Sequence, residues 1–172
     1  MSTLISLPAS SFIGDQDAQL VTGDAAASHI NLVGRPALAF DDTEEEAAVS
    51  VEFEMPSQYS GSGLTATVHF AMASEEMMNV AIDIFVEAKT SDSDALDMES
   101  ASGWGSVNSG TMQVDSAAEG APQTLDITLS NNDSVAVGDL VRIGIRRDAD
   151  HETDDDHAGD MFVFCVTLED DG

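Results

Sequence analysis

Residues 49–56 decide the fold, and they read Val-Ser-Val-Glu-Phe-Glu-Met-Pro. Apolar side chains stand at every second position, with serine and glutamate between them, until the proline ends the run. A period of two places successive side chains on opposite faces of an extended chain. The stretch therefore predicts a half-buried β-strand.

The same alternation recurs further along the chain, separated by turn-rich segments. Strands are predicted over residues 64–72, 80–86, 125–129, 141–145 and 161–168, with weaker candidates at 37–40 and 111–114. The segment 161–168 is apolar on both faces, which is typical of a central buried strand. About eight short strands predict an all-β fold, an eight-stranded antiparallel β-sandwich of jelly-roll type. An immunoglobulin-like sandwich shares this periodicity, but the chain lacks the Cys…Trp…Cys spacing of antibody domains.

The first 35 residues differ in texture from the rest of the chain. They are small, polar and weakly periodic, with Gly14, Gly23 and Gly34 as breakers. A chain of 172 residues fits one domain, or one domain with a short arm. We expect residues 1–35 to form an N-terminal arm or an extra edge strand, and residues 36–172 to form the sandwich domain.

Charge is the strongest signal in the composition. The chain has 33 Asp and Glu against 5 Lys and Arg, a formal net charge of -28, and Lys89 is its only lysine. Such a charge destabilises a compact state by self-repulsion, and at about 1 M salt the screening length falls to roughly 3 Å. The composition predicts a salt-adapted protein. The alternative is an acidic protein of an ordinary organism that binds cations or a basic partner.

The same charge argues against two classes of partner. Phosphate backbones are bound by clustered Lys and Arg, so nucleic acid is not an expected partner, and anionic membrane surfaces are disfavoured for the same reason. No segment approaches the roughly 20 apolar residues that span a bilayer. Residues 1–8 lack the basic region and the long apolar stretch of a signal peptide.

The segment 146–160 holds the densest set of metal-ligating groups. Four acids follow one another at every second position: Asp148, Asp150, Glu152 and Asp154. This spacing resembles a calcium loop, but there is no Gly at the sixth position and no Glu at the twelfth. His151 and His157 match no established ligand spacing. The sequence predicts either a solvated loop between the last two strands or a structural cation site, for Ca²⁺ or another cation, and no other cofactor.

Four further residues are candidates for an interface. Arg142, Arg146 and Arg147 are three of the five basic residues, and they either pair with a neighbouring subunit or neutralise acids within their own. Trp104, the sole tryptophan, stands between two glycines. A tryptophan in such a loop either anchors a partner surface or folds back over the end of the sandwich.

No arrangement for catalysis stands out. The chain has no G-x-S-x-G elbow, no G-x-G-x-x-G motif and no P-loop. A glycosidase needs only two well-placed carboxylates, but among 33 acids any pair is weak evidence. We therefore expect a protein that is not an enzyme.

Five segments, taken in order, carry a family resemblance. They are residues 34–47, 51–59, 138–143, 146–150 and 158–161. With their AFDDT start, their F-MP--Y strand end and their GDLVR…RRDAD…AGD finish, they resemble jelly-roll virion structural proteins of tailed phages and haloarchaeal tailed viruses, of the capsid decoration or turret kind. The resemblance spans roughly residues 34–170. This chain departs from it in its extreme acidity and in the insertion at 151–157.

The resemblance implies a virion structural protein with no active site. In this interpretation the chain is a capsid decoration or turret component of a salt-adapted tailed virus, located on the capsid surface and assembled in the host cytoplasm. Its expected partners are copies of itself, as a trimer or pentamer, and the major capsid protein or other virion proteins. One alternative is a tail-fibre or spike module that recognises the host surface. Another is a carbohydrate-active enzyme or lectin, for which one Trp and one Tyr offer little aromatic lining.

Overall fold

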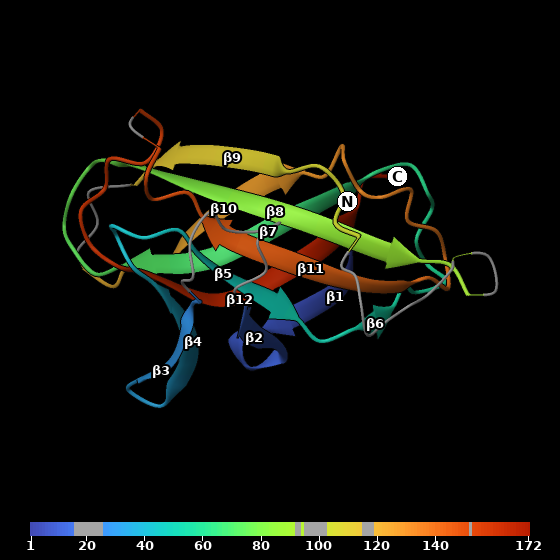
Figure 1. Ribbon diagram of the computed structural model, residues 1–172, viewed down its shortest axis with the longest axis horizontal. Helices are drawn as coiled ribbons and strands as arrows, with labels where there is room; N and C mark the ends of the chain where they lie inside the picture. The colour runs from blue at the N-terminus through green and yellow to red at the C-terminus, as the bar shows by residue number, and fades with distance from the viewer. Residues whose placement is uncertain (16–25, 92–93, 95–102, 115–118, 152) are drawn as a thin grey trace.

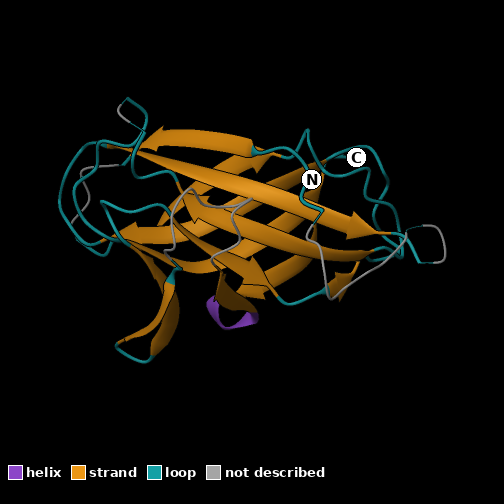
Figure 2. Ribbon diagram, in the orientation of Figure 1, coloured by secondary structure: helices purple, strands orange, loops and turns teal. Residues whose placement is uncertain are grey.

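The computed structural model of the chain describes residues 1–15, 26–91, 94, 103–114, 119–151 and 153–172. These residues form twelve β-strands and one short 3-10 turn, Ala9–Ser11. Figure 2 shows strands throughout the two layers of the molecule. None of the described helical segments is long and apolar enough to cross a bilayer. The all-β antiparallel sandwich predicted from the alternation is confirmed.

Six strands make the first sheet, and all their pairings are antiparallel. Its order is β10 (Gln123–Thr128), β7 (Leu64–Met72), β12 (Met161–Asp170), β4 (Arg35–Phe40) and β3 (Ser28–Leu32). β1 (Ser2–Pro8) pairs with β12 in the register Ser2↔Asp170, so the two ends of the chain lie side by side. Figure 1 shows both termini at one end of the sandwich.

The second sheet also has six strands, again paired antiparallel. Its order is β2 (Phe12–Asp15), β5 (Glu46–Ser50), β11 (Leu140–Arg147), β8 (Asn79–Lys89) and β9 (Asn108–Gln113), and β6 (Phe53–Glu54) pairs with β11. In Figure 1 this sheet lies in front of the first. The core lies between the two sheets, where alternate residues of the long central strands are buried: Val68, Phe70, Ile82, Ile84, Ile143, Ile145 and Val163. Burying each such side chain contributes about 1.5–3 kcal/mol.

The stretch 49–56 departs from the single strand that its alternation predicts. β5 ends at Ser50 and β6 begins at Phe53. The Ser50 hydroxyl accepts a hydrogen bond from the Ile143 backbone N–H at 2.9 Å, where a ladder carbonyl would otherwise serve. Val51 is consequently 48% exposed, whereas Met55 is fully buried. The apolar residues of the stretch therefore do not share one face.

The first 35 residues contribute three strands to the sheets. β1 lies beside β12, β2 forms one edge of the second sheet beside β5, and β3 forms one edge of the first sheet beside β4. These strands, with the division of 46–54 into β5 and β6, account for the excess over about eight. The β3–β4 hairpin projects from the body of the sandwich in Figure 1.

Candidate functional site

The outer face of the second sheet brings together two of the predicted arginines. In the register of β8 and β11, Arg142 lies opposite Glu87 and Arg146 lies opposite Asp83. Because the strand period is two, both arginines point away from the core. Phe85 lies between the two acids on the same face of β8. The result is an aromatic ring flanked by two cross-strand ion pairs.

Glu87 holds the first ion pair in a shielded position. It accepts hydrogen bonds from the Arg142 Nε and from the Gly103 backbone N–H, and Lys89 Nζ lies 4.0 Å from it. The Glu87 side chain is nearly buried, whereas that of Arg142 is 26% exposed. The arginine side chain is therefore partly open to solvent, while Glu87 compensates its charge.

Asp83 holds the second ion pair in the same manner. It accepts hydrogen bonds from the Arg146 guanidinium, at 3.1 Å from Nε, and from the Ser109 hydroxyl at 2.5 Å. Arg146 Nη1 also lies 3.2 Å from Glu45. Burial opposes the charge on Arg146, but the hydrogen bond and charge of Asp83 outweigh it and raise the pKa of this arginine above its ordinary value. Three acids, Glu45, Asp83 and Glu87, thus face three basic residues on this sheet.

Trp104 closes over this face. The Arg142 Cζ lies 4.6 Å from the centroid of its ring, and Arg146 Cζ lies 5.6 Å from that of Phe85. Trp104 also packs against a small apolar cluster formed by Phe85, Ala47 and Val49. An open hollow of about 520 Å³ lies beside it, lined by Phe85, Trp104, Gly105, Ser106, Val107 and Arg146. We call Phe85, Trp104, Arg142 and Arg146 the aromatic–arginine face.

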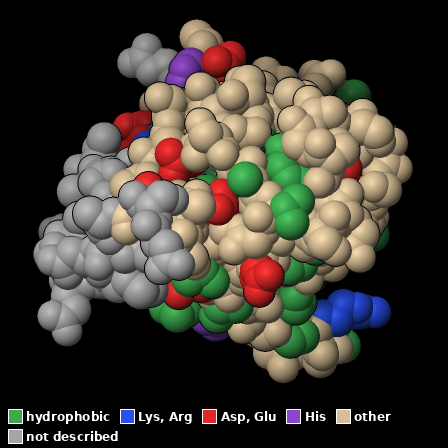
Figure 3. Space-filling model, turned by 90° about the vertical axis from the view of Figure 1, so that its right-hand side faces the viewer, with side chains coloured by type: hydrophobic (Ala, Val, Ile, Leu, Met, Phe, Trp, Pro, Cys, Tyr) green, Lys and Arg blue, Asp and Glu red, His purple; other side chains and the backbone are tan. Residues whose placement is uncertain are grey.

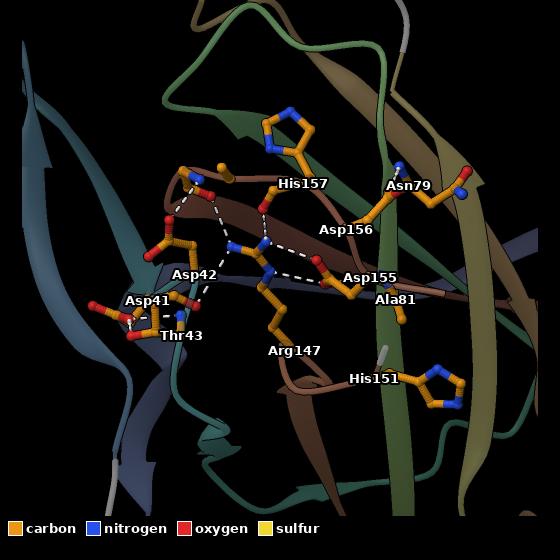
Figure 4. Close-up of polar contacts among 12 residues, drawn as sticks. Asp41, Asp42, Thr43, Asn79, Ala81, Arg147, His151, Asp155, Asp156 and His157 are labelled. Atoms are coloured by element: carbon orange, nitrogen blue, oxygen red, sulfur yellow. Dashed lines mark hydrogen bonds and ion pairs between the residues drawn. The ribbon is translucent and has the colours of Figure 1, made fainter. Parts of the chain in front are cut away.

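Arg147, the third predicted arginine, points the other way. Arg146, the residue before it, faces outward. Because side chains alternate along a strand, Arg147 faces inward, and it is 0% exposed. Its guanidinium makes a forked pair with Asp155, at 2.9 Å from Nε and 2.8 Å from Nη2. It also donates to the carbonyls of His157 at 2.6 Å and Gly159 at 2.8 Å (Figure 4). Arg147 thus takes the intra-subunit role that the sequence left open, and it has no surface to offer a partner.

The acidic series of the 148–160 loop does not converge on one point. Ligand oxygens of Asp148 and Asp150 lie within 4.8 Å of each other and of Glu45. Asp154 instead lies 3.5 Å from His151, and Glu152 lies outside the described residues. Glu45 was missed by the sequence analysis because it comes from the chain just before β5, which pairs with the end of β11. Cross-strand register is the information that would have found it.

Asp148 is the most perturbed group of this set. Burial, the charge of Asp83 and a hydrogen bond with Glu45 raise its pKa from 3.8 to about 6, against the opposing effect of Arg146. A second group of three acids, Asp41, Asp42 and Asp160, also lies within 4.8 Å. In that group Asp42 accepts the Gly159 N–H at 2.9 Å. Carboxylates are the ligand type that Ca²⁺ prefers, but solvated acid clusters are expected throughout a chain this acidic.

The two histidines of the loop lie in different environments. His151 is on the surface beside Asp154. His157 is 2% exposed, and neither ring nitrogen has a hydrogen-bond partner among the described residues. Its ring points away from Arg147 in Figure 4. The structure therefore does not join the two histidines in one metal site.

The comparisons with known proteins bear on the fold. No family model matches the chain, and no curated protein does. Among solved structures it is similar to the CBM22-1–GH10 modules of a xylanase from Clostridium thermocellum complexed with xylohexaose, with a TM-score of 0.51 at 11% identity over 100% of this chain and 29% of that one. A carbohydrate-binding module CBM36 in complex with calcium and xylotriose gives a TM-score of 0.49 at 12% identity, over 96% of this chain and 99% of that one. An adhesin domain of Lys-gingipain from Porphyromonas gingivalis W83 gives 0.48 at 10% identity, over 100% and 97%. The likeness is one of fold.

Proposed function

We propose that this chain is a non-catalytic structural module of a virus particle. In its specific form it is a capsid decoration or turret component of a salt-adapted tailed virus. It is a homo-oligomer (trimer or pentamer), and it binds neighbouring virion proteins through the aromatic–arginine face. The observation that carries the proposal is the local compensation of charge. On a molecule with a net charge of -28, three basic side chains face three acids here, beside the sole tryptophan.

Electrostatics favours this face as the contact. Neighbouring proteins in a salt-adapted particle carry acidic surfaces of their own, and like charges repel two such surfaces in contact. On this face Asp83 and Glu87 are each paired with an arginine, which reduces that repulsion, while Asp148 adds a further acid beside Glu45. Arginine and aromatic residues are also the types enriched at the energetic centres of interfaces. The resemblance of residues 34–170 to virion proteins supplies the context.

A second candidate is a tail-fibre or spike module that recognises the host surface. The open hollow beside Trp104 and Phe85 favours it, because aromatic rings and hydrogen-bonding side chains are the groups that hold small polar ligands. The fold is shared with the xylanase modules complexed with xylohexaose. A surface glycan is accordingly the ligand class to test for this second function.

Copy number in purified particles separates the candidates. Quantitative mass spectrometry against the major capsid protein is expected to give hundreds of copies for a decoration component and a handful for a fibre or spike. Absence of the chain from purified particles would overturn both.

The contact face is tested by rebinding of the recombinant protein to particles that lack it. Arg142→Glu and Trp104→Ala are expected to weaken rebinding at least tenfold. Glu75→Gln, a substitution in the exposed loop before β8, is the matched control and is expected to bind as the wild type does. Equal rebinding of all variants would contradict the assignment of this face.

A further inference from the structure

We infer that the tip of the β3–β4 hairpin seats in an apolar groove of a second copy of this chain. This contact uses the first sheet and is independent of the aromatic–arginine face. It rests on three observations: the residue at the tip, the groove beside the hairpin, and the charges around both.

The hairpin tip carries an apolar residue in a strained conformation. The turn consists of Val33, with φ 53°, and Gly34, with φ 83°. Two-residue turns of this kind favour Asn or Asp before Gly, because a β-branched residue fits the left-handed region poorly. Val33 is nevertheless 95% exposed to solvent. Val33 thus combines a backbone conformation that valine disfavours with an apolar side chain exposed to water. This combination points to a role of Val33 in contact with another molecule.

A groove of about 610 Å³ lies between the hairpin and the outer face of the first sheet. Most of its lining is apolar: Leu32, Val33, Ala71, Met72, Pro122, Phe162 and Phe164, so the tip residue of each copy also borders its own groove. The two phenylalanines are the outward-facing residues of β12, and each is only partly buried. Their position explains why the sequence of this central strand is apolar on both faces. The two rings also provide an apolar surface that an exposed valine complements.

The charges at the groove favour a second copy as the occupant. Each of the other four basic residues has an acid within 4.0 Å, whereas Arg35 has no ion-pair partner among the described residues. Residues 26–40 contain no Asp or Glu, in a chain that has 33. Arg35 and Glu119 both border the groove, and both are exposed. When the tip of one copy enters the groove of another, Arg35 of the first meets the acidic surface of the second, with Glu119 at its rim.

One end of the molecule is shown in space-filling form in Figure 3. There a basic side chain projects at the lower right beside hydrophobic side chains, while acidic side chains are spread over the rest of the view.

Each copy has both a tip and a groove, so it gives one contact and receives one. Such contacts close into a ring when the rotation that relates one copy to the next allows it. The net charge of each copy opposes association in dilute buffer, and salt screens that repulsion. Association is therefore expected to strengthen as salt rises.

Sedimentation equilibrium of the full chain in about 0.3 M and about 3 M NaCl tests the inference. The wild type is expected to self-associate in high salt, and Val33→Asp is expected to be monomeric. Val33→Asn is the sharper variant, because asparagine suits the left-handed backbone but removes the apolar tip. It is expected to associate at least tenfold more weakly, with a melting temperature no lower than that of the wild type.

A charge reversal identifies the occupant. Arg35→Glu is expected to weaken association, and the double variant Arg35→Glu/Glu119→Arg is expected to recover it. An equimolar mixture of Arg35→Glu and Glu119→Arg is expected to recover it too, because the mixture restores opposite charges between copies and not within one. A monomeric wild type at both salt concentrations would overturn the inference. So would wild-type association by Val33→Asn, or failure of the double variant to recover.

Discussion

At the residue scale, Arg147 ties the acidic loop to the core. Its fork to Asp155 and its bond to the His157 carbonyl are buried, and its bond to the Gly159 carbonyl is partly buried. Asp155 also accepts the Ala81 N–H at 3.1 Å, which links the loop to β8. Removing the arginine leaves a buried carboxylate unpaired. Arg147→Met is therefore expected to lower the free energy of unfolding by about 3–5 kcal/mol.

Urea denaturation in high salt measures this loss. Arg142→Met is the matched control. Its ion pair on the same strand is partly exposed, and Glu87 keeps the Gly103 N–H and Lys89 beside it, so a smaller loss than that of Arg147→Met is expected. Similar losses for the two variants would contradict the role assigned to Arg147.

Asp148 makes a pH-dependent contribution to stability. Its sign is opposite to that of a carboxylate whose pKa is lowered on folding. Its pKa is raised to about 6 in the folded protein, from an ordinary 3.8. The native state thus holds a proton more firmly than the unfolded chain, so this contribution to stability falls as pH rises from about 4 to about 6. Asp148→Asn is expected to raise the melting temperature at pH 8 and to leave it unchanged near pH 3.5.

Thermal melts across this pH range check the effect, with Asp154→Asn, an exposed acid of the same loop, as the control. A shift of equal size at both pH values for Asp148→Asn would contradict the assignment.

At the element scale, the long alternating segments were predictable and their interruptions were not. β7 has the predicted bounds, and β8, β10, β11 and β12 overlap their predicted segments, with ends that differ by up to three residues. Along β11 the same alternation puts Arg142 and Arg146 on one face and Arg147 on the other. It would therefore have placed Arg147 in the interior. The break between β5 and β6 accompanies a tertiary contact, the hydrogen bond from the Ile143 N–H to the Ser50 hydroxyl. Such a tertiary contact leaves no trace in the local pattern.

The candidate site was predictable only in part, for the same reason. Trp104, Arg142 and Arg146 were found because their residue types are rare in this chain. Their acidic partners could not be found in the same way, because the chain has 33 acids. No single acid stands out until the strand register is known.

Gly110 allows two edge strands from different sheets to approach. A Cβ at this position of β9 would lie 2.6 Å from the Ile127 Cγ1 of β10. Gly110→Ala is accordingly expected to destabilise the fold by about 1–3 kcal/mol through overpacking. In a double-mutant cycle, the substitution is expected to cost less in an Ile127→Ala background. Additive effects would show that this contact does not set the distance between β9 and β10.

At the scale of the whole molecule, the net charge is expected to make stability depend on salt. A charge of -28 on 172 residues opposes compaction until salt screens it. The melting temperature is expected to rise between about 0.1 M and 3 M NaCl, where the screening length falls from roughly 10 Å to below 3 Å. Differential scanning calorimetry at constant pH measures this. An unchanged melting temperature would contradict salt adaptation.

The pairing of β1 with β12 bears on how the module withstands force. Ser2 lies opposite Asp170, so the two chain ends leave the sheet from the same end of adjacent antiparallel strands. Tension applied between the termini would load the hydrogen bonds of this pair one after another, like a zipper, because they run across the strands. A module held by its two termini would therefore peel from its ends at low force. Attachment through a sheet face would spread the same force over many contacts at once.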